Sequence, residues 1–172
     1  MGSQSQANPP PLSLQALLAR ETVRAKVALS SWDEAVRHVG RLLVDAGLVR
    51  GEYIAAMARV LREMGPYAVI APGTVLLHAR PEDGVIRPCM GLITLATPVP
   101  FGHSQNDPVD LVFAFGAIDK TSHIAALQQL AQLLGNTTAL EFLRQAQDDS
   151  QLLAAIHSWH PAGEGALSPA PD

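Results

Sequence analysis

Residues 63–85 of the chain, EMGPYAVIAPGTVLLHARPEDGV, decide the fold and contain the most informative side chain. Two short apolar runs, 68–71 and 75–77, are separated by a Pro-Gly pair, which is a typical tight-turn signal. Apolar runs of this length between turn signals are typical of buried β-strands. The second run leads directly into His78. The stretch therefore predicts a strand that ends with an imidazole at the edge of a sheet, where functional side chains are often found.

Helical and extended patterns alternate through the rest of the chain. A helix is expected after Ser31, because this serine N-cap is followed by two acids in the first turn, where the helix dipole favours them. Similar start signals occur at Asp119, Asn136 and Asp148. The expected helices are about 12–18, 32–46, 52–64, 122–134, 137–146 and 148–156, and the expected strands are 23–29, 68–71, 75–77, 90–97 and 109–118.

This alternation predicts an α/β protein, a single domain with one mixed β-sheet flanked by helices on both faces. The Pro-Gly turn and the loop at 98–108 are hairpin-like connections, which indicates some antiparallel pairing. The run 109–118 is the most apolar in the chain and is expected to form a central strand. The folded part is expected at 12–158, between a disordered tail at 1–11 and a flexible tail at 159–172.

Composition argues against several classes of function. The chain has 172 residues and a formal net charge of −4, and its basic residues are scattered, which argues against a nucleic-acid partner. The single Cys89 excludes an internal disulfide and a Cys-rich zinc site. No apolar run approaches the ~18–20 residues that cross a bilayer, and the N-terminus lacks signal-peptide features, so a cytoplasmic protein without membrane insertion is expected. Walker and G-x-G-x-x-G patterns are absent from the sequence, so no nucleotide cofactor is expected.

His78 is the candidate nucleophile. A neutral imidazole attacks phosphorus readily, and a pKa near ~6.5 keeps it largely unprotonated at cellular pH. Arg80 follows two residues later, close enough to neutralise part of the charge of a phosphoryl group. Without a nucleotide-binding motif, that group would have to come from another protein. The alternative is a half-buried histidine bonded to a backbone carbonyl, and residue spacing does not separate the two interpretations.

His123 is the second candidate, since it falls in the first turn of the helix that follows the expected central strand. Backbone N–H groups at a helix N-terminus bind anions, so His123 would face a phosphate or orient the first imidazole. A solvent-exposed side chain is the alternative. His103 is expected on the surface of a polar loop. His157 and His160 have an i, i+3 spacing that suits zinc, but they lack a nearby third ligand, so no metal site is expected.

The chain also contains a series of short motifs in a characteristic order. They are EMGPY (63–67), IAPG (70–73), HARPEDGV (78–85), PVPFG (98–102), NDPV (106–109) and the run from Val112 through Asp119 to His123-Ile124. In this order they resemble the enzyme IIA components of the bacterial phosphoenolpyruvate-dependent sugar phosphotransferase system (PTS), of the mannitol/fructose type. Within that type the chain is most similar to the ascorbate-type IIA subunits. The resemblance covers about residues 12–158, and it is specific as a set of motifs.

The resemblance implies a fold, a reaction and a set of partners. The fold would be a mixed sheet sandwiched by helices, and no metal or cofactor would be needed. The residue at the His78 position accepts a phosphoryl group from the histidine-containing phosphocarrier protein HPr and passes it to a cysteine of enzyme IIB, which serves a membrane IIC permease for ascorbate or a related carbohydrate. The family's second active-site histidine falls on His123, and an assisting arginine falls on Arg62; the residues themselves add Arg80 as a second phosphate-stabilising candidate.

Several alternatives stay open from the sequence. The family usually has proline directly before the active histidine, where this chain has Leu77, which adds a backbone N–H to the strand. An inactive site on the family fold is therefore one alternative to the relay subunit. Another is a regulatory module that is phosphorylated on His78 without onward transfer, and both a monomer and a homodimer remain open. The apolar rim for docking partners is expected at Leu77, Val85 and Phe101.

Overall fold

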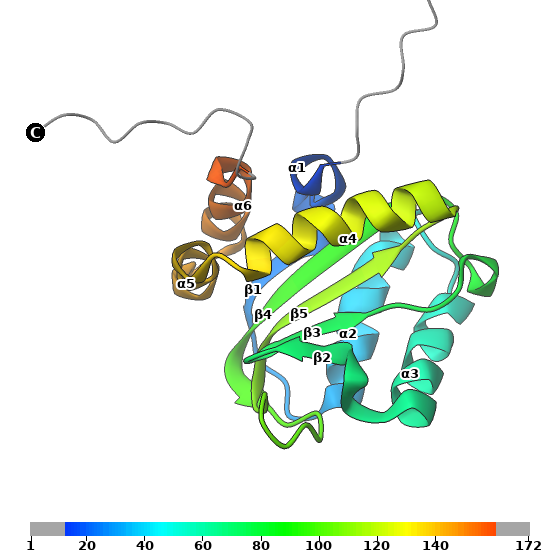
Figure 1. The fold of residues 1–172 in the computed structure, drawn as a ribbon, viewed down its shortest axis with the longest axis horizontal. Helices are drawn as coiled ribbons and strands as arrows, with labels where there is room; N and C mark the ends of the chain where they lie inside the picture. The colour runs from blue at the N-terminus through cyan, green and yellow to red at the C-terminus, as the bar shows by residue number, and fades with distance from the viewer. Residues whose placement is uncertain (1–12, 161–172) are drawn as a thin grey trace, which may run out of the picture.

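The computed structural model describes residues 13–160, in which one mixed β-sheet carries helices on both faces (Figure 1). The strands are β1 (Val23–Val27), β2 (Val69–Ala71), β3 (Thr74–Leu77), β4 (Cys89–Val99) and β5 (Val109–Gly116). The α-helices of this part are α1 (Leu14–Leu17), α2 (Trp32–Asp45), α3 (Glu52–Met64), α4 (Lys120–Leu134), α5 (Thr137–Gln145) and α6 (Asp149–Ser158). Short 3₁₀ turns lie between them at η1 (Arg20–Thr22), η2 (Gly65–Ala68) and η3 (Pro81–Asp83).

The strand order is β1-β4-β5-β3-β2, so β5 is the central strand, as predicted. β4 pairs antiparallel with β5 across the 98–108 loop, and β2 pairs antiparallel with β3 across the Pro-Gly turn, which confirms the pairing expected from both connections. β3 runs parallel to β5, with Leu77 opposite Ala114. The carboxyl ends of β3 and β5 therefore lie at the same edge of the sheet, next to the beginning of α4 (Figure 1).

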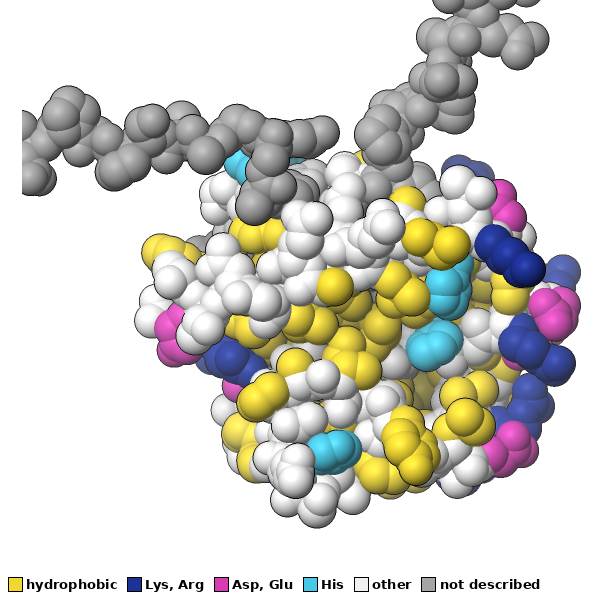
Figure 2. All heavy atoms as spheres, in the orientation of Figure 1, with side chains coloured by type: hydrophobic (Ala, Val, Ile, Leu, Met, Phe, Trp, Pro, Cys, Tyr) yellow, Lys and Arg dark blue, Asp and Glu magenta, His cyan; other side chains and the backbone are white. Residues whose placement is uncertain are grey.

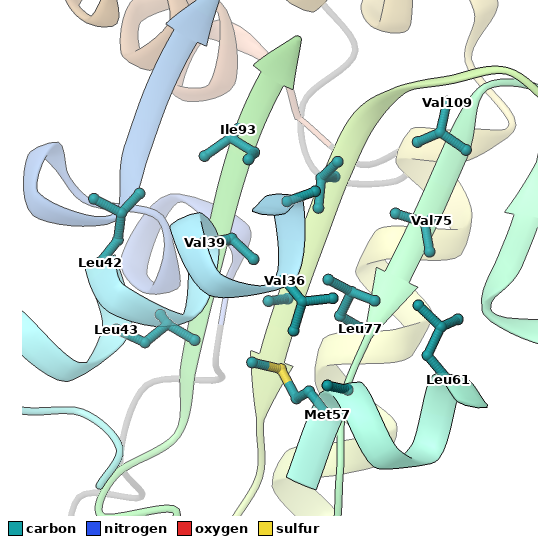
Figure 3. Close-up of a cluster of buried hydrophobic side chains, with 14 of the residues drawn as sticks. Val36, Val39, Leu42, Leu43, Met57, Leu61, Val75, Leu77, Ile93 and Val109 are labelled. Atoms are coloured by element: carbon teal, nitrogen blue, oxygen red, sulfur yellow. The ribbon is translucent and has the colours of Figure 1, made fainter. Parts of the chain in front are cut away.

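Each face of the sheet has its own hydrophobic core. α2 and α3 cover one face, where Val36 and Val39 of α2 and Met57 of α3 pack against the strands (Figure 3). α1, α4, α5 and α6 cover the other face, where they pack against Phe113 and Phe115 of β5. Because β5 is buried on both faces, its sequence is almost continuously apolar instead of alternating.

The predicted helix N-caps are confirmed. In each case a short polar side chain accepts a hydrogen bond from a backbone N–H in the first turn and satisfies a donor that the helix itself leaves unpaired. The capping residues and their donors are Ser31 with Glu34, Asp119 with Ser122, Asn136 with Ala139 and Asp148 with Gln151. The cap at Asp119 sets the position at which α4 begins beside the ends of β3 and β5.

A few predicted boundaries were wrong by small amounts. β1 ends two residues earlier than expected, near Lys26, which has a positive φ of 54° and interrupts the register with β4. Trp159, predicted to begin the flexible tail, is only 9% exposed, and its carbonyl accepts a hydrogen bond from Gln15, so the folded part includes it. The predicted tails otherwise lie outside the described residues, except for His160. Between residues 13 and 160, no helix has both the length and the apolar character required to cross a bilayer.

The two-core architecture gives a prediction for stability. Leu43 of α2 is fully buried against the sheet, so Leu43→Ala is expected to lower the free energy of unfolding by about 2–5 kcal/mol, measured by urea denaturation. Arg41 is exposed on the same helix, and Arg41→Ala is the control, with an expected change within about 0.5 kcal/mol. Equal losses for the two variants would contradict the packing of α2 on the sheet.

Candidate functional site

The side chain of His78 lies where β3 leaves the sheet, directly after the buried Leu77. Its ring centroid lies 5.1 Å from that of Phe115 and 6.4 Å from that of His123. The rings of Phe115 and His123 are 5.2 Å apart in an edge-on arrangement, so the three aromatic side chains form one cluster. Figure 2 shows two histidine side chains side by side on one face of the molecule, among mainly hydrophobic neighbours. The two histidines singled out from the sequence are therefore brought together by the fold.

The topology explains why these three residues meet. Side chains alternate between the faces of a strand, so His78 is on the same side as Leu76, the side on which α4 packs, while Leu77 is on the side of α2 and α3. Phe115 is on the α4 side of β5, one strand away. The chain then turns through Asp119 into α4, whose first turn contains His123. Segments that are far apart in sequence thus contribute one imidazole each.

The hydrogen bonding of His78 defines which ring nitrogen is available. Its Nδ1 lies 3.4 Å from the carbonyl oxygen of Leu76. A carbonyl can only accept, so this contact favours the tautomer with the proton on Nδ1, which leaves a lone pair on Nε2. This contact also matches the structural alternative, a half-buried histidine bonded to a backbone carbonyl. The bond occupies only Nδ1, however. The structural alternative also gives no reason for a second imidazole to lie beside the ring.

The electrostatics of the site keep His78 neutral. Burial lowers the pKa of His78 below 6.5, and a positive charge on His123 lowers it further, whereas the bond to Leu76 opposes both effects. At neutral pH the ring is therefore unprotonated and its Nε2 lone pair is free.

The beginning of α4 is held by a tight capping arrangement. The Asp119 carboxylate accepts from Ser122 N at 2.8 Å, and the Ser122 hydroxyl donates back to the Asp119 carbonyl. His123 N also donates to the Asp119 carbonyl, at 3.1 Å. Hydrogen bonds from Ser122 hold the pKa of Asp119 below its ordinary value, so the cap is ionised at neutral pH. These contacts hold the backbone of His123 in one position relative to β5.

The two candidate arginines lie at the surface and have other partners. The guanidinium of Arg62, in the last turn of α3, lies 6.0 Å above the ring of Trp32. Arg80 has its Nε 3.4 Å from the Asp83 carboxylate and 3.7 Å from that of Glu82. Among the described residues, no hydrogen bond or ion pair joins either guanidinium to the two imidazoles. Their part in phosphate stabilisation therefore stays a prediction.

The hydrophobic surroundings of His78 differ from the predicted rim. Leu77 and Phe101 are only 1% and 8% exposed, and Val85 packs against the same core, so these residues face the interior instead of a partner. Three exposed apolar side chains, Met64, Tyr67 and Ile70, line a pocket of about 150 Å³ together with Leu76 and His78. Met64 and Tyr67 belong to the motif at 63–67. The hydrophobic pattern does not separate apolar residues that are exposed from those that are buried.

The remaining candidates have structural roles. His103 Nδ1 accepts hydrogen bonds from Gln105 N and Asn106 N at 3.1 and 2.9 Å, so it organises its own loop. His157 has its Nε2 3.4 Å from the Leu18 carbonyl at the end of α6. In residues 13–160, no group of three or more His, Cys, Asp or Glu side chains is placed to hold a metal ion. Cys89 is buried, and burial raises the pKa of its thiol to about 12, so it is a core residue and not a nucleophile.

Two residues of the site were not identified from the sequence. Phe115 was part of the expected central strand, but nothing in the pattern indicated that its ring lies against both imidazoles. Tyr53 of α3 donates from its hydroxyl to the Phe115 carbonyl at 2.7 Å and accepts from Ala79 N at 3.0 Å. A tyrosine on the inward face of a helix usually indicates no more than a buried core position, so no signal in the sequence indicated these hydrogen bonds.

Comparisons with known proteins agree with this fold. The family model described as "Phosphoenolpyruvate-dependent sugar phosphotransferase system, EIIA 2" matches residues 16–159. An ascorbate-specific PTS system EIIA component of Salmonella typhi is 34% identical over 141 residues, which is 81% of this chain and 92% of that protein.

Solved structures of related proteins show the same architecture. The solution structure of the mannitol-specific cryptic phosphotransferase enzyme IIA CmtB from Escherichia coli superimposes with a TM-score of 0.74 at 31% identity, over 84% of this chain and 98% of that one. A complex of mannitol enzyme IIA and phosphorylated enzyme IIB from Escherichia coli matches in fold, with a TM-score of 0.70 at 22% identity, over 82% and 99% of the two chains.

A mixed sheet with two opposed imidazoles at its edge, together with these matches, defines a phosphoryl-carrier class of protein. The chain belongs to the EIIA type 2 family of the phosphoenolpyruvate-dependent sugar phosphotransferase system. It is a PTS transferase component related to the ascorbate-specific EIIA proteins.

The lowered pKa of His78 can be measured directly. In an NMR titration, the His78 imidazole is expected to titrate below 6.5, and His123→Ala is expected to raise its midpoint because a neighbouring positive charge is removed. The unfolded chain takes up this proton first, so His78 contributes stability above pH 6.5 that is lost as the pH falls through its folded pKa. A midpoint at or above 6.5 in the wild-type protein would contradict the burial of this ring.

Proposed function

We propose that His78 carries the phosphoryl group, which it accepts from HPr and passes to a cysteine of enzyme IIB. The observation that supports this role is a half-buried neutral imidazole whose Nδ1 is bonded to the Leu76 carbonyl, whose Nε2 is available, and which has a second imidazole 6.4 Å away. A neutral nitrogen with a free lone pair is the form that attacks phosphorus.

The transfer is an in-line displacement at phosphorus. Nε2 of His78 forms a P–N bond as the P–N bond of the donor's phosphohistidine breaks, and the electron pair of that bond stays on the donor ring. The proton on Nδ1 remains in place, and the Leu76 carbonyl stabilises the positive charge that develops on the ring. In the second step a thiolate of enzyme IIB attacks the phosphorus, and His78 leaves as a neutral imidazole. Neither step requires a metal or cofactor.

The surrounding groups would stabilise the charge on the transferred oxygens. His123 at the beginning of α4, with its ring centroid 6.4 Å from that of His78, would donate a hydrogen bond to them. Arg62 and Arg80 are long, exposed side chains that would join the site when a phosphorylated partner docks. Arg62 would leave the Trp32 ring, and Arg80 would leave its carboxylate partners. Phosphoryl transfer depends mainly on such positioning and electrostatic stabilisation.

The docking surface for both partners would be the apolar patch formed by Met64, Tyr67 and Ile70, next to His78. Apolar contacts there would exclude water from the phosphohistidine, so that the group is relayed and not hydrolysed. HPr and enzyme IIB must use the same face in turn, so each complex is expected to be small and transient. The related mannitol enzyme IIA forms a complex with phosphorylated enzyme IIB. The chain would act in the cytoplasm, and the IIC permease that it serves indirectly would transport ascorbate or a related carbohydrate, in line with its similarity to ascorbate-specific proteins.

Phosphotransfer from labelled phosphoenolpyruvate, enzyme I and HPr tests the role of His78. The wild-type protein is expected to take up label and His78→Ala to take up none, while His123→Ala is expected to slow uptake at least about tenfold because one stabilising donor is lost. His103→Ala is the matched control and is expected to behave as wild type. Label on the His78→Ala variant would overturn the assignment. Uptake without onward transfer to enzyme IIB would favour a regulatory module over a relay subunit.

The proposed docking patch gives a separate prediction. Met64 and Phe142 are both 61% exposed, but only Met64 lies beside His78. Met64→Ala is expected to raise the KM for phosphorylated HPr about fivefold, which corresponds to the loss of about 1 kcal/mol of binding free energy from one well-buried interface contact. Phe142→Ala is expected to leave this KM unchanged. An equal change in KM for the two variants would show that the partners dock elsewhere.

A further inference from the structure

The hydrogen bonds between β3 and β5 follow a regular parallel pattern up to His78. In this pattern every second residue of β3 forms both bonds to β5: its N–H donates to one β5 carbonyl and its carbonyl accepts from the N–H two residues further on. Gly73, just before β3, begins this set with its carbonyl alone, which accepts from Leu111 N at 3.0 Å, while its own N–H donates to the Asn106 carbonyl in the loop. Together with the register in which Leu77 is opposite Ala114, this places Val75 and Leu77 in the same set.

The next member of the set would be Ala79. Continued by two residues, the register would direct Ala79 N–H at the carbonyl of Phe115. The strand ends at Leu77, however, and the hydroxyl of Tyr53 stands between these two groups. Ala79 N donates to the hydroxyl at 3.0 Å, and the hydroxyl donates to the Phe115 carbonyl at 2.7 Å. A single side-chain oxygen from α3 thus replaces the direct strand-to-strand bond.

This insertion has a defined consequence for the two imidazoles. The backbone of His78 is held on both sides. The residue before it, Leu77, is paired in the sheet, and the N–H of the residue after it, Ala79, donates to the Tyr53 hydroxyl. The same hydroxyl holds the carbonyl of Phe115, whose ring contacts both His78 and His123. The N–H of Ala79 thus stays bonded although the chain has left the sheet.

Tyr53 is suited to this role by its environment. Its side chain is fully buried, and burial raises the pKa of its hydroxyl well above the ordinary value, so it remains a neutral group that donates one bond and accepts another. We infer that Tyr53 is a positioning residue for phosphoryl transfer: its hydroxyl, inserted between β3 and β5, holds His78 and the Phe115 ring in the geometry that the reaction needs. This inference rests on the proposed role of His78.

Tyr53→Phe tests the inference, because it removes the hydroxyl and retains the ring. Small displacements of a reacting group cost large factors in rate, so the rate constant for His78 phosphorylation at saturating HPr is expected to fall about tenfold or more. The KM for HPr is expected to stay within about twofold of wild type, because Met64, Tyr67 and Ile70 of the docking patch are untouched. The His78 titration midpoint is expected to rise toward 6.5, because water reaches a ring that is no longer held.

The control is Ile93→Val, which removes one methyl group from the same core, where Ile93 is fully buried on β4. Its stability loss is measured alongside that of Tyr53→Phe by urea denaturation, and it is expected to leave both the rate constant and the His78 midpoint unchanged. A merely structural Tyr53 would give the same rate constant and midpoint in the two variants, and that result would overturn the inference.

A measurement on the wild-type protein applies even if Tyr53→Phe does not fold. The amide of Ala79 lies beyond the last residue of β3, so without the hydroxyl it would exchange rapidly with solvent. Slow hydrogen exchange at Ala79 is expected, and rapid exchange would contradict the insertion. Failure of the proposed function can be told apart from failure of this inference. Phosphorylation of the His78→Ala variant would remove His78 as the acceptor, but the Ala79 exchange and the His78 titration would still test the position of Tyr53.

Discussion

The parallel pairing of β3 with β5, and its interruption directly after His78, is the constraint on which the site depends. The pairing brings a residue from the first half of the chain next to Phe115 and the beginning of α4. The strand ends at Leu77, directly before His78, whose imidazole is half-buried. The position of this strand end therefore sets where the imidazole lies.

The two hydrophobic cores keep that strand end in place. One core holds Leu77 on the side of α2 and α3, and the other holds Leu76 and Phe115 on the side of α4. His78 is thus attached to a rigid support on both faces of the sheet, while its Nε2 stays available. Burial also keeps the ring neutral, as the proposed role of a nucleophile requires, and the Leu76 carbonyl bonds to Nδ1 and not to Nε2. Packing and protonation state follow from the same arrangement.

Much of this arrangement could be predicted from the sequence. The Pro-Gly turn, the apolar strands and the four N-caps follow from local rules, and these rules placed nearly all the elements and the central position of β5. The meeting of His78 and His123 was one of two interpretations of the helix start at Asp119, and the set of motifs favoured it. The docking rim was predicted wrongly, because Leu77 and Phe101 are apolar for packing, whereas Met64 and Tyr67 are apolar and exposed. Tyr53 was missed because its role depends on a hydrogen bond between distant segments, which periodicity does not record.

The central claim is that Nε2 of His78 is the atom that receives the phosphoryl group, because Nδ1 is bonded to the Leu76 carbonyl. Nitrogen-15 NMR of the phosphorylated, labelled protein tests this most directly, because coupling to phosphorus identifies the bonded ring nitrogen. Coupling to Nε2 of His78 is expected, with the proton retained on Nδ1. Coupling to Nδ1 of His78, or to a nitrogen of His123, would contradict it.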